Sequence, residues 1–437
     1  MPPVDPPRVL FVTSSAFNHV TGGGITFSNL FRGWPKDRLA TVHNDTVPVA
    51  DDVCRRYYRL GPSEITRWPR LRAHRPAAAM EQAPASAQPA AAPLRLAKRV
   101  LIGNAWPDSG RLSRELEGWI ADYRPEVLYT ILGAIGMMEL VDAIRVRFDL
   151  PLVVHFMDDW PSDLYRGGLL SWAPNARMRG LLKRLVGAAA VRMAIGEDMA
   201  RAYEQRHGTP FSVFQNAVAP SGEAAKAPPG DATIRVVYVG SIFGNAQSES
   251  LIDIAEAVSR LASRGAPMRF DIFSPLHLAE AFRDQLEISP AVTLRDTITD
   301  DAEFFRRIAL ADILVLPVNF DAASVRLIRY SMPTKLPAYL VSGTPILVYG
   351  PSGVAQIEDA RRHGWGLVVA RRDTDELSTA LTRLAEDAAL RASLVDKARD
   401  LARDRHDAAR VRAGFQERLV AARATTMRGR AGYRRER

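Results

Sequence analysis

The chain alternates short apolar runs with longer segments in which apolar residues recur every three or four positions. Apolar runs bounded by glycine, proline or polar residues indicate buried strands, and the longer spacing indicates helices. In the first half of the sequence, this pattern predicts strands over 8–13, 39–43, 57–60, 126–132, 152–156, 188–195 and 211–214. It predicts helices over 25–34, 94–106, 113–122 and 197–207, and a helix start at 133–136.

The second half of the sequence repeats the alternation. Strands are predicted over 234–239, 269–273, 292–294, 313–317, 345–349 and 364–369. Helices are predicted over 248–260, from 300 onward, from 333–335 through 339–340, and from 373 to about 417. Two successive runs of alternating strand and helix predict an α/β fold with two doubly wound, Rossmann-like domains facing a cleft.

The expected boundaries follow from changes in composition. We expect an N-terminal Rossmann-like domain over 8–218, a proline-rich linker over 219–231, a C-terminal Rossmann-like domain over 232–400, and a C-terminal helix with a basic tail over 401–437. Residues 73–93 are rich in alanine and proline, which is typical of a flexible surface insertion.

Composition narrows the class of protein. The 437 residues are 47% hydrophobic and 24% charged, which is typical of a globular protein. A single cysteine, Cys54, excludes an intrachain disulfide framework and a cysteine-based zinc site. No signal peptide or bilayer-spanning apolar run is readable, so we expect a cytoplasmic protein.

The net charge of +9 indicates anionic partners, either nucleotide phosphates, anionic lipid or nucleic acid. No nucleic-acid-binding module is readable, so no nucleic-acid partner is expected. The basic and apolar segment 94–106 has two interpretations, an ordinary amphipathic helix on the core or a membrane-surface segment. The second interpretation would place the protein peripherally at the inner face of the membrane.

The stretch 312–351 contains the strongest signal for a binding site. An apolar strand ends at Pro317, and a polar loop carrying Arg326, Arg329 and Ser331 follows it. Pro333, Thr334 and Lys335 then open a helix before the next strand. Phosphates favour helix N-termini, and ligands of open α/β sheets bind at the carboxyl ends of strands. A nucleotide diphosphate would suit this position.

The motif S-x-P-x-K-x-x-x-Y-L-x-x-G-x-P-I, from Ser331 to Ile346, resembles the donor-sugar site of family-four bacterial glycosyltransferases, which have the two-domain GT-B fold. The resemblance extends over roughly 8–400, and it implies that the domain over 8–218 is on the acceptor side and the domain over 232–400 binds the nucleotide-sugar donor. Many relatives carry two glutamates in this region, where this chain has Tyr330 and Ala338, so it resembles a variant branch.

The resemblance also implies roles for residues elsewhere in the second half. Gly240 and Ser241 resemble the phosphate-facing turn of the family. The arginine and lysine that often follow this turn are missing, so Lys335, Arg326 or Arg329 is expected to supply the positive charge.

Two candidates for ligand binding lie in the N-terminal half. Gly22, Gly23 and Gly24 either form a tight turn with close packing or let backbone N–H groups approach a diphosphate or sugar. His155, Asp158 and Asp159 end the strand 152–156, where acid/base or acceptor-binding residues are expected. The alternatives are loop capping by the aspartates and a packed histidine.

From the resemblance we expect transfer of a sugar from a nucleotide-diphosphate sugar to a saccharide or lipid-linked acceptor in polysaccharide or cell-envelope assembly. Retention of configuration is implied. We expect no metal and no cofactor beyond the nucleotide-sugar co-substrate, because the resemblance implies that helix N-termini and basic residues, rather than a tightly bound metal, meet the charge of the diphosphate. Alternative hypotheses are a nucleotide-sugar epimerase or hydrolase and a non-catalytic nucleotide-sugar-binding protein.

Overall fold

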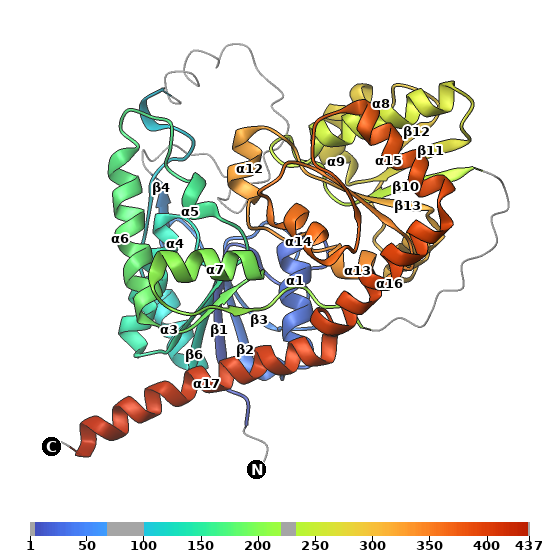
Figure 1. The fold of residues 1–437 in the computed structure, drawn as a ribbon. Coiled ribbons are helices and arrows are strands. Elements are labelled where there is room, and N and C mark those ends of the chain that lie inside the picture. The colour runs from blue at the N-terminus through green and yellow to red at the C-terminus, as the bar shows by residue number, and fades with distance from the viewer. Residues whose placement is uncertain (1–4, 68–99, 220–232, 436–437) are drawn as a thin grey trace. The chain divides into compact units, whose positions relative to one another are not determined.

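A computed structural model describes residues 5–67, 100–219 and 233–435, with side chains up to 425 (Figure 1). The chain forms two compact units. Unit 1 contains the described residues up to Gln215 and the chain from Arg410 onward, and unit 2 runs from Asn216 to Ala409. The predicted insertion at 73–93 and almost all of the predicted linker at 219–231 lie outside the described residues.

Unit 1 is built on a seven-stranded parallel sheet with the strand order β3-β2-β1-β6-β7-β8-β9. Its strands are β1 (Val9–Thr13), β2 (Leu39–His43), β3 (Arg56–Arg59), β6 (Val127–Thr130), β7 (Leu152–Phe156), β8 (Ala189–Ala194) and β9 (Ser212–Val213). A separate antiparallel pair consists of β4 (Ile65–Arg67) and β5 (Asp108–Gly110). Every strand of the large sheet overlaps a predicted one.

The helical elements of unit 1 are α1 (Gly22–Phe31), η1 (Lys36–Arg38), α3 (Arg114–Tyr123), α4 (Ile135–Phe148), α5 (Trp160–Asp163), α6 (Trp172–Ala188), α7 (Glu197–His207) and most of α17 (Ala408–Arg435). In the described part of the predicted helix 94–106, the chain is helical only over 100–102. The prediction is wrong from Gly103 onward, because Gly103 leaves the helix with a φ of 86°.

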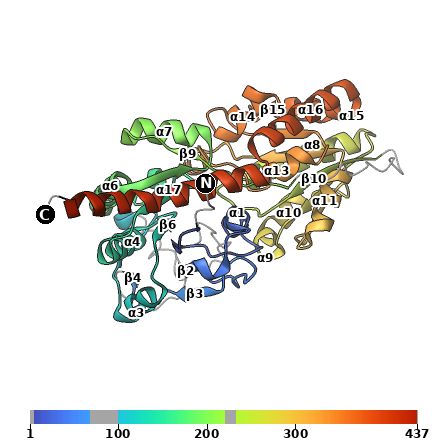
Figure 2. The ribbon, with the colours of Figure 1, turned by 90° about the horizontal axis from the view of Figure 1, so that it is seen from below.

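The core of unit 1 contains a cluster of aromatic rings to which α17 contributes. The ring of Phe415 lies 4.9 Å from that of Phe31 and 5.6 Å from that of Tyr129, both between centroids. Arg412 also donates a hydrogen bond to the carbonyl of Asn29 at 2.8 Å. Figures 1 and 2 show α17 as a long red helix beside the strands of unit 1. This helix is therefore part of the unit that the N-terminal half of the chain builds.

Unit 2 is built on a six-stranded parallel sheet with the strand order β12-β11-β10-β13-β14-β15. Its strands are β10 (Ile234–Val239), β11 (Met268–Phe273), β12 (Val292–Arg295), β13 (Ile313–Pro317), β14 (Ile346–Tyr349) and β15 (Leu367–Val369). Its helical elements are α8 (Ser248–Ser263), α9 (Leu276–Ala279), η3 (Glu280–Phe282), α10 (Arg283–Leu286), α11 (Asp301–Leu310), α12 (Ala322–Ile328), α13 (Leu336–Val341), α14 (Ala355–His363), α15 (Thr374–Glu386) and α16 (Ala388–Arg405).

The predicted polar loop after β13 is wrong in part, because α12 occupies 322–328. Asp321 starts this helix, since its carboxylate accepts hydrogen bonds from the backbone N–H groups of Ala323 and Ser324, both at 3.0 Å.

Both large sheets are doubly wound, as predicted. The strand order reverses between β1 and β6 in unit 1 and between β10 and β13 in unit 2. Ligands of open α/β sheets bind outside the carboxyl ends of strands at such reversals. The residues that follow these four strands are therefore the first to consider for function.

Candidate functional site

Gly240 follows β10 at the reversal point of unit 2. Its φ is +146°, and its N–H donates to the carbonyl of Phe273 at 2.9 Å. A Cβ at this position would lie 2.4 Å from the Lys335 Nζ. Only glycine has both the required backbone freedom and the space, so this residue lets the lysine ammonium lie against the turn.

The Lys335 ammonium lies over the face of the Tyr238 ring, 3.8 Å from its centroid. Tyr238 is buried, and its hydroxyl donates to the carbonyl of Ser241 at 2.7 Å. Within the described residues, no carboxylate pairs with Lys335, and burial lowers the pKa of its ammonium to about 7. The site therefore holds a cation whose charge is only weakly compensated by the ring.

The backbone around Lys335 is fixed by contacts on both sides. Lys335 is the N-cap of α13, so the helix begins one residue later than the predicted opening at 333–335. The Thr334 carbonyl accepts a hydrogen bond from the Asn216 side chain at 2.7 Å. Further along α13, the Tyr339 hydroxyl accepts one from the Val239 N–H at 3.0 Å. These bonds fix α13 against the end of β10.

The two predicted arginines lie on α12 and just after it. Arg326 and Arg329 are exposed, and the Arg329 guanidinium lies 5.2 Å from the centroid of the Tyr330 ring. No carboxylate in the described part of the chain pairs with either arginine. Ser331 and Pro333 follow in a partly exposed turn. The structure thus brings Gly240, Ser241 and Lys335 together, and it places Arg326 on α12 and Arg329 directly after that helix.

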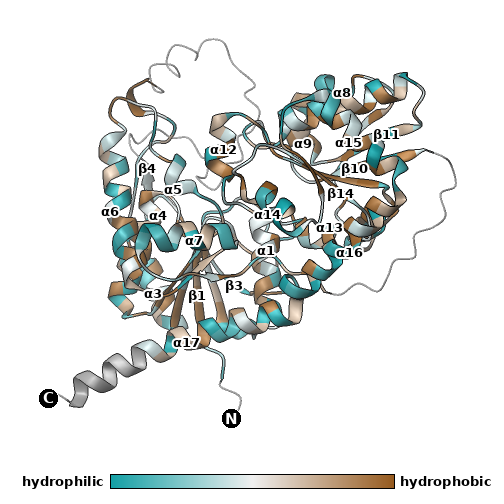
Figure 3. Ribbon diagram, in the orientation of Figure 1, coloured by the Kyte–Doolittle hydropathy of each residue, from teal (hydrophilic) through white to brown (hydrophobic). Residues whose placement is uncertain are grey.

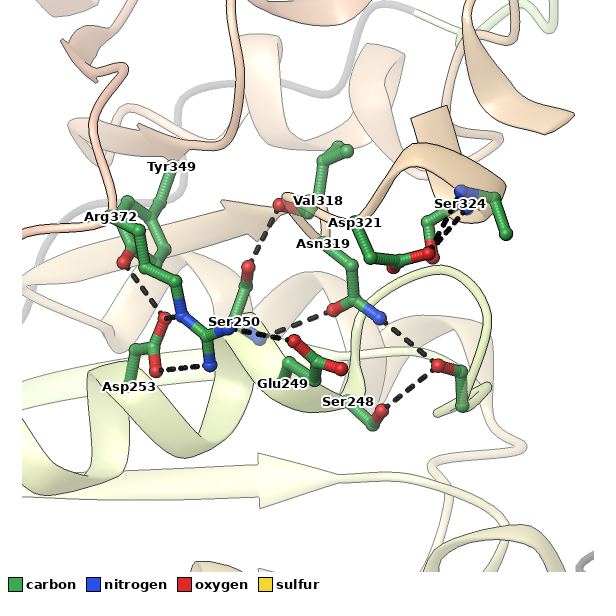
Figure 4. A network of polar contacts seen from close by, with 12 residues as sticks. Ser248, Glu249, Ser250, Asp253, Val318, Asn319, Asp321, Ser324, Tyr349 and Arg372 are labelled. Atoms are coloured by element: carbon green, nitrogen blue, oxygen red, sulfur yellow. Dashed lines mark hydrogen bonds and ion pairs between the residues drawn. The ribbon is translucent and has the colours of Figure 1, made fainter. Parts of the chain in front are cut away.

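A polar network, buried at Asn319 and partly exposed at Arg372, joins the carboxyl ends of four strands of unit 2 (Figure 4). Asn319, which is fully buried, accepts from the Ser250 N–H at 3.2 Å and donates to the Gly244 carbonyl at 3.1 Å. Asp253 accepts from the Tyr349 hydroxyl at 2.9 Å and forms an ion pair with Arg372 at 3.0 Å. This network holds the loops around Gly240 in place.

Sequence reasoning missed this network. Its partners lie 69 to 119 residues apart, as between Ser250 and Asn319 or between Asp253 and Arg372. One signal was available, because Asn319 is a polar residue two positions after the end of the buried strand β13.

In unit 1, the glycine run forms the first turn of α1. The Thr21 hydroxyl caps this helix by accepting from the Gly24 N–H at 3.2 Å. A Cβ on Gly24 would lie 2.3 Å from the buried side chain of Asn18, so the tight-packing alternative explains this glycine. Gly22 and Gly23 are more exposed, and a ligand-binding role for them stays a prediction.

His155 is fully buried, and both of its ring nitrogens have partners. Nδ1 lies 2.8 Å from the Tyr129 hydroxyl, and Nε2 lies 3.2 Å from the Phe214 carbonyl. Burial lowers the pKa of this histidine to about 4. The geometry is that of the packed-histidine alternative, so we do not include His155 in the reaction.

The two aspartates that follow β7 have different environments. The Asp159 carboxylate is buried, with the Tyr203 hydroxyl at 2.7 Å and the Arg206 guanidinium at 3.0 Å. Asp158 is partly exposed and accepts from the Trp160 N–H at 3.1 Å. Although the residue is partly exposed, its carboxyl is desolvated by the surrounding residues, which raises the pKa of Asp158 to about 6. Asp158 is therefore the better placed of the two for acid/base chemistry.

Leu132 was not singled out from the sequence. It follows β6 at the reversal point of unit 1, is buried, and has a φ of +57°. This conformation is costly for a leucine and is typical of strained positions beside functional sites. Its N–H donates to the Thr130 hydroxyl at 3.0 Å, which helps to hold the turn.

Among the residues that the structure describes, no cluster of three or more histidine, cysteine, aspartate or glutamate side chains could hold a metal ion. In the same part of the chain, no helix has both the length and the apolar character that crossing a bilayer requires.

Solved structures with the same fold are glycosyltransferases and related synthases. WaaG, a glycosyltransferase involved in lipopolysaccharide biosynthesis, is 13% identical, with a TM-score of 0.58 over 94% of this chain and 99% of its own. Sucrose-phosphate synthase from Thermosynechococcus elongatus is 13% identical, with a TM-score of 0.61 over 94% and 98%. HepE from Anabaena, in complex with UDP-glucose, is 12% identical, with a TM-score of 0.58 over 94% and 99%. The fold is that of the GT-B glycosyltransferases, as predicted.

Residues 233–387 match the family model described as Glycosyl transferases group 1. The match covers most of unit 2, so this part of the chain is similar to a glycosyltransferase group 1 domain. No curated protein sequence matches the chain.

Proposed function

We propose that the protein transfers a sugar from a nucleotide-diphosphate sugar to a saccharide or lipid-linked acceptor, with unit 2 binding the donor. The observation that carries this proposal is the Lys335 ammonium, held between Gly240 and Tyr238 without an acidic partner in the described residues. A diphosphate would supply the missing negative charge. The match of 233–387 to the group 1 family supports the same assignment.

In this reaction, Lys335 would stabilise the charge that develops on the leaving nucleoside diphosphate. Arg326 and Arg329, whose guanidinium groups are exposed, would add positive charge nearby. Asp158 would accept the proton of the acceptor hydroxyl or orient it, since its pKa of about 6 leaves it largely ionised at neutral pH. Retention of configuration, cell-envelope glycan assembly and independence from metal are part of the proposal through the resemblance.

The first experiment is a thermal-stability screen against UDP, GDP, ADP, TDP and CDP, with and without a chelator. A ligand at about 100 times its Kd should stabilise the protein by about 2.7 kcal/mol. One strong responder, unchanged by the chelator, would identify the base and support metal-independent binding. No responder among the five would count against the donor site at Lys335.

A second experiment separates the proposal from the epimerase, hydrolase and non-catalytic alternatives. The nucleotide sugar that corresponds to the responding base is incubated with and without candidate acceptors. Product that forms only with an acceptor supports transfer, whereas a changed or hydrolysed donor without acceptor supports an epimerase or hydrolase. Binding without any turnover would support the non-catalytic alternative.

A further inference from the structure

Unit 1 carries an exposed apolar cluster at the N-terminal end of α6. Leu169, Leu170 and Trp172 are 72%, 59% and 72% exposed, and Val100 and Leu101 are about half exposed. Figure 3 shows hydrophobic colour in the ribbon beside this end of α6. We call these five residues the apolar tip. Isolated exposed apolar residues are common, but a contiguous group marks an interaction surface.

The two segments that form the apolar tip are held together by backbone contacts. The N–H groups of Leu169 and Leu170 donate to the carbonyls of Val100 and Leu101 at 2.9 and 2.8 Å. A Cβ on Gly103 would lie 2.0 Å from the Arg166 carbonyl oxygen. Two segments that are distant in sequence therefore pack closely to form the apolar tip. Their large apolar side chains are nevertheless exposed.

The outer face of α6 continues the apolar tip with positive charge. Trp172, Ala176, Arg179 and Lys183 are spaced at i, i+4, i+7 and i+11, so they share one face of the helix, and all four are exposed. This face extends about 16 Å from Trp172 to Lys183. Methionine, leucine and valine side chains on the opposite face are buried: Met178, Leu181, Leu182, Leu185 and Val186.

The charges on the two exposed sides of α6 differ. On the side toward α4, Arg177 pairs with Glu139, and Arg184 pairs with Asp142 at 2.6 Å. On the outer face, no carboxylate in the described part of the chain pairs with Arg179 or Lys183. Arg166, beside the apolar tip, is exposed and also lacks a carboxylate partner there. Three uncompensated cations thus flank the apolar tip.

We propose that the apolar tip and the outer face of α6 dock on an anionic lipid bilayer. Leucine and tryptophan side chains enter the headgroup boundary, and Arg166, Arg179 and Lys183 contact anionic headgroups, which is the arrangement of an interfacial membrane-binding surface. A second copy of this chain is a poorer occupant, because it would bring the same three cations against each other.

The docking proposal does not depend on the proposed function. The position of this surface also indicates the kind of acceptor, and that inference rests on the proposed function. α6 follows β7 and runs antiparallel to the strands of a parallel sheet. Its N-terminal end therefore lies on the side of the strands' carboxyl ends, where Asp158 follows β7. A docked bilayer would lie at that edge, and this arrangement favours a lipid-linked acceptor over a freely soluble saccharide.

The first test uses a fluorescent probe on the full chain. Cys54 is fully buried and is the chain's single cysteine, so Leu170→Cys can be labelled selectively with an environment-sensitive dye. Phosphatidylcholine vesicles that contain phosphatidylglycerol should shift the dye emission to shorter wavelength, and pure phosphatidylcholine vesicles should not. The matched control is Ile288→Cys, an exposed apolar position in unit 2, where no shift is expected. Equal responses at both positions would overturn the proposal.

The second test is vesicle co-sedimentation with variants. Leu169→Ser combined with Trp172→Ser, and separately Arg179→Glu combined with Lys183→Glu, should each weaken binding to anionic vesicles about tenfold or more, because each buried apolar side chain and each headgroup-facing cation contributes. Arg264→Glu combined with Arg418→Glu changes the net charge equally at exposed sites elsewhere and should have little effect.

Removal of residues 426–437 tests the basic tail as the alternative binding element. Binding that the tail deletion abolishes but the apolar-tip variant keeps would overturn the proposal. Concentration-dependent dimerisation that the apolar-tip variant abolishes, without vesicle binding, would instead assign the surface to a second copy. Circular dichroism of each variant establishes that it remains folded.

Discussion

The Lys335 ammonium lies 3.8 Å from the centroid of the Tyr238 ring, at the turn that Gly240 makes after β10. The ring face supplies partial negative charge but no formal charge. The lysine is therefore held in place and remains ready to bind an anion.

Replacement of Lys335 by methionine should weaken binding of the donor diphosphate by about tenfold to a hundredfold, because a charge-assisted hydrogen bond contributes roughly 1.5–3 kcal/mol. Calorimetric titration with the responding nucleotide measures the effect. Lys397→Met, at an exposed position of α16, is the matched control and should bind normally. Normal binding by the Lys335 variant would remove this residue from the site.

Donor binding should weaken as the pH rises from about 7 to 9. The pKa of Lys335 is lowered to about 7 by burial, so in the free protein the ammonium loses its proton over this range. Binding would then have to restore the proton, with a cost of up to tenfold in affinity per pH unit. Lys335→Arg keeps its charge throughout and should flatten the profile. A flat wild-type profile would contradict the assignment.

The same lowered pKa predicts an effect on stability. Since the unfolded chain binds this proton more tightly, the charged lysine costs stability below pH 7, and the cost fades as the pH rises from 7 toward 10.5. Lys335→Met should therefore raise the free energy of unfolding at pH 6 by on the order of 1–3 kcal/mol. The gain should shrink by pH 10. Denaturant unfolding at both pH values measures it, and a constant difference would contradict this cause.

Gly240→Ala should disrupt the donor site, and Gly265→Ala should not. Both glycines have positive φ, +146° and +93°. A Cβ at Gly240 meets the Lys335 Nζ at 2.4 Å, whereas at Gly265 nothing lies within 4 Å. Both variants should lose roughly 1 kcal/mol or more of stability from backbone strain. Loss of donor affinity in Gly240→Ala alone would show that the contact with Lys335 matters, and equal loss in both would attribute it to strain.

Asp158→Asn should lower turnover by about 10²-fold or more, as removal of a general base does, while donor binding stays unchanged. The wild-type rate should fall below pH 6, since the pKa of Asp158 is raised to about 6 by burial, and this limb should vanish in the variant. Asp159→Asn is the contrasting change, because it weakens the contact with Arg206 and should mainly cost stability. Wild-type turnover in Asp158→Asn would refute the role.

How well the sequence predicted the fold depended on burial. The strands β2 and β7 were predicted at their observed bounds, because every residue in both is buried and a strand buried on both faces is mostly apolar. The helix α6 was not predicted, although its buried residues recur at helical spacing, because Pro174, Gly180 and Gly187 are residues that argue against a helix in a sequence. The predicted helix over 94–106 ends at Gly103, where the backbone lies close to the Arg166 carbonyl, and no local sequence pattern shows this contact.

Residues of the candidate site were predicted only where they belong to a recognisable sequence motif. Lys335 and Gly240 were named from the sequence, but their direct contact was not, because 95 residues separate them. The same limit applies to the Asn319 network, whose members meet only after the sheet has formed. For His155, alternation along the strand indicated an inward position, and the contact with Tyr129 agrees with it.

The aromatic cluster of unit 1 has a consequence for how the protein is made. Phe415, on α17, packs between rings from α1, β6 and the segment after β9, which are synthesised far earlier. On the ribosome, unit 2 emerges whole before this helix does. The unit whose synthesis starts first can thus be completed only after the second, and until then the rings of Phe31, Tyr129 and Phe214 lack their contact with Phe415.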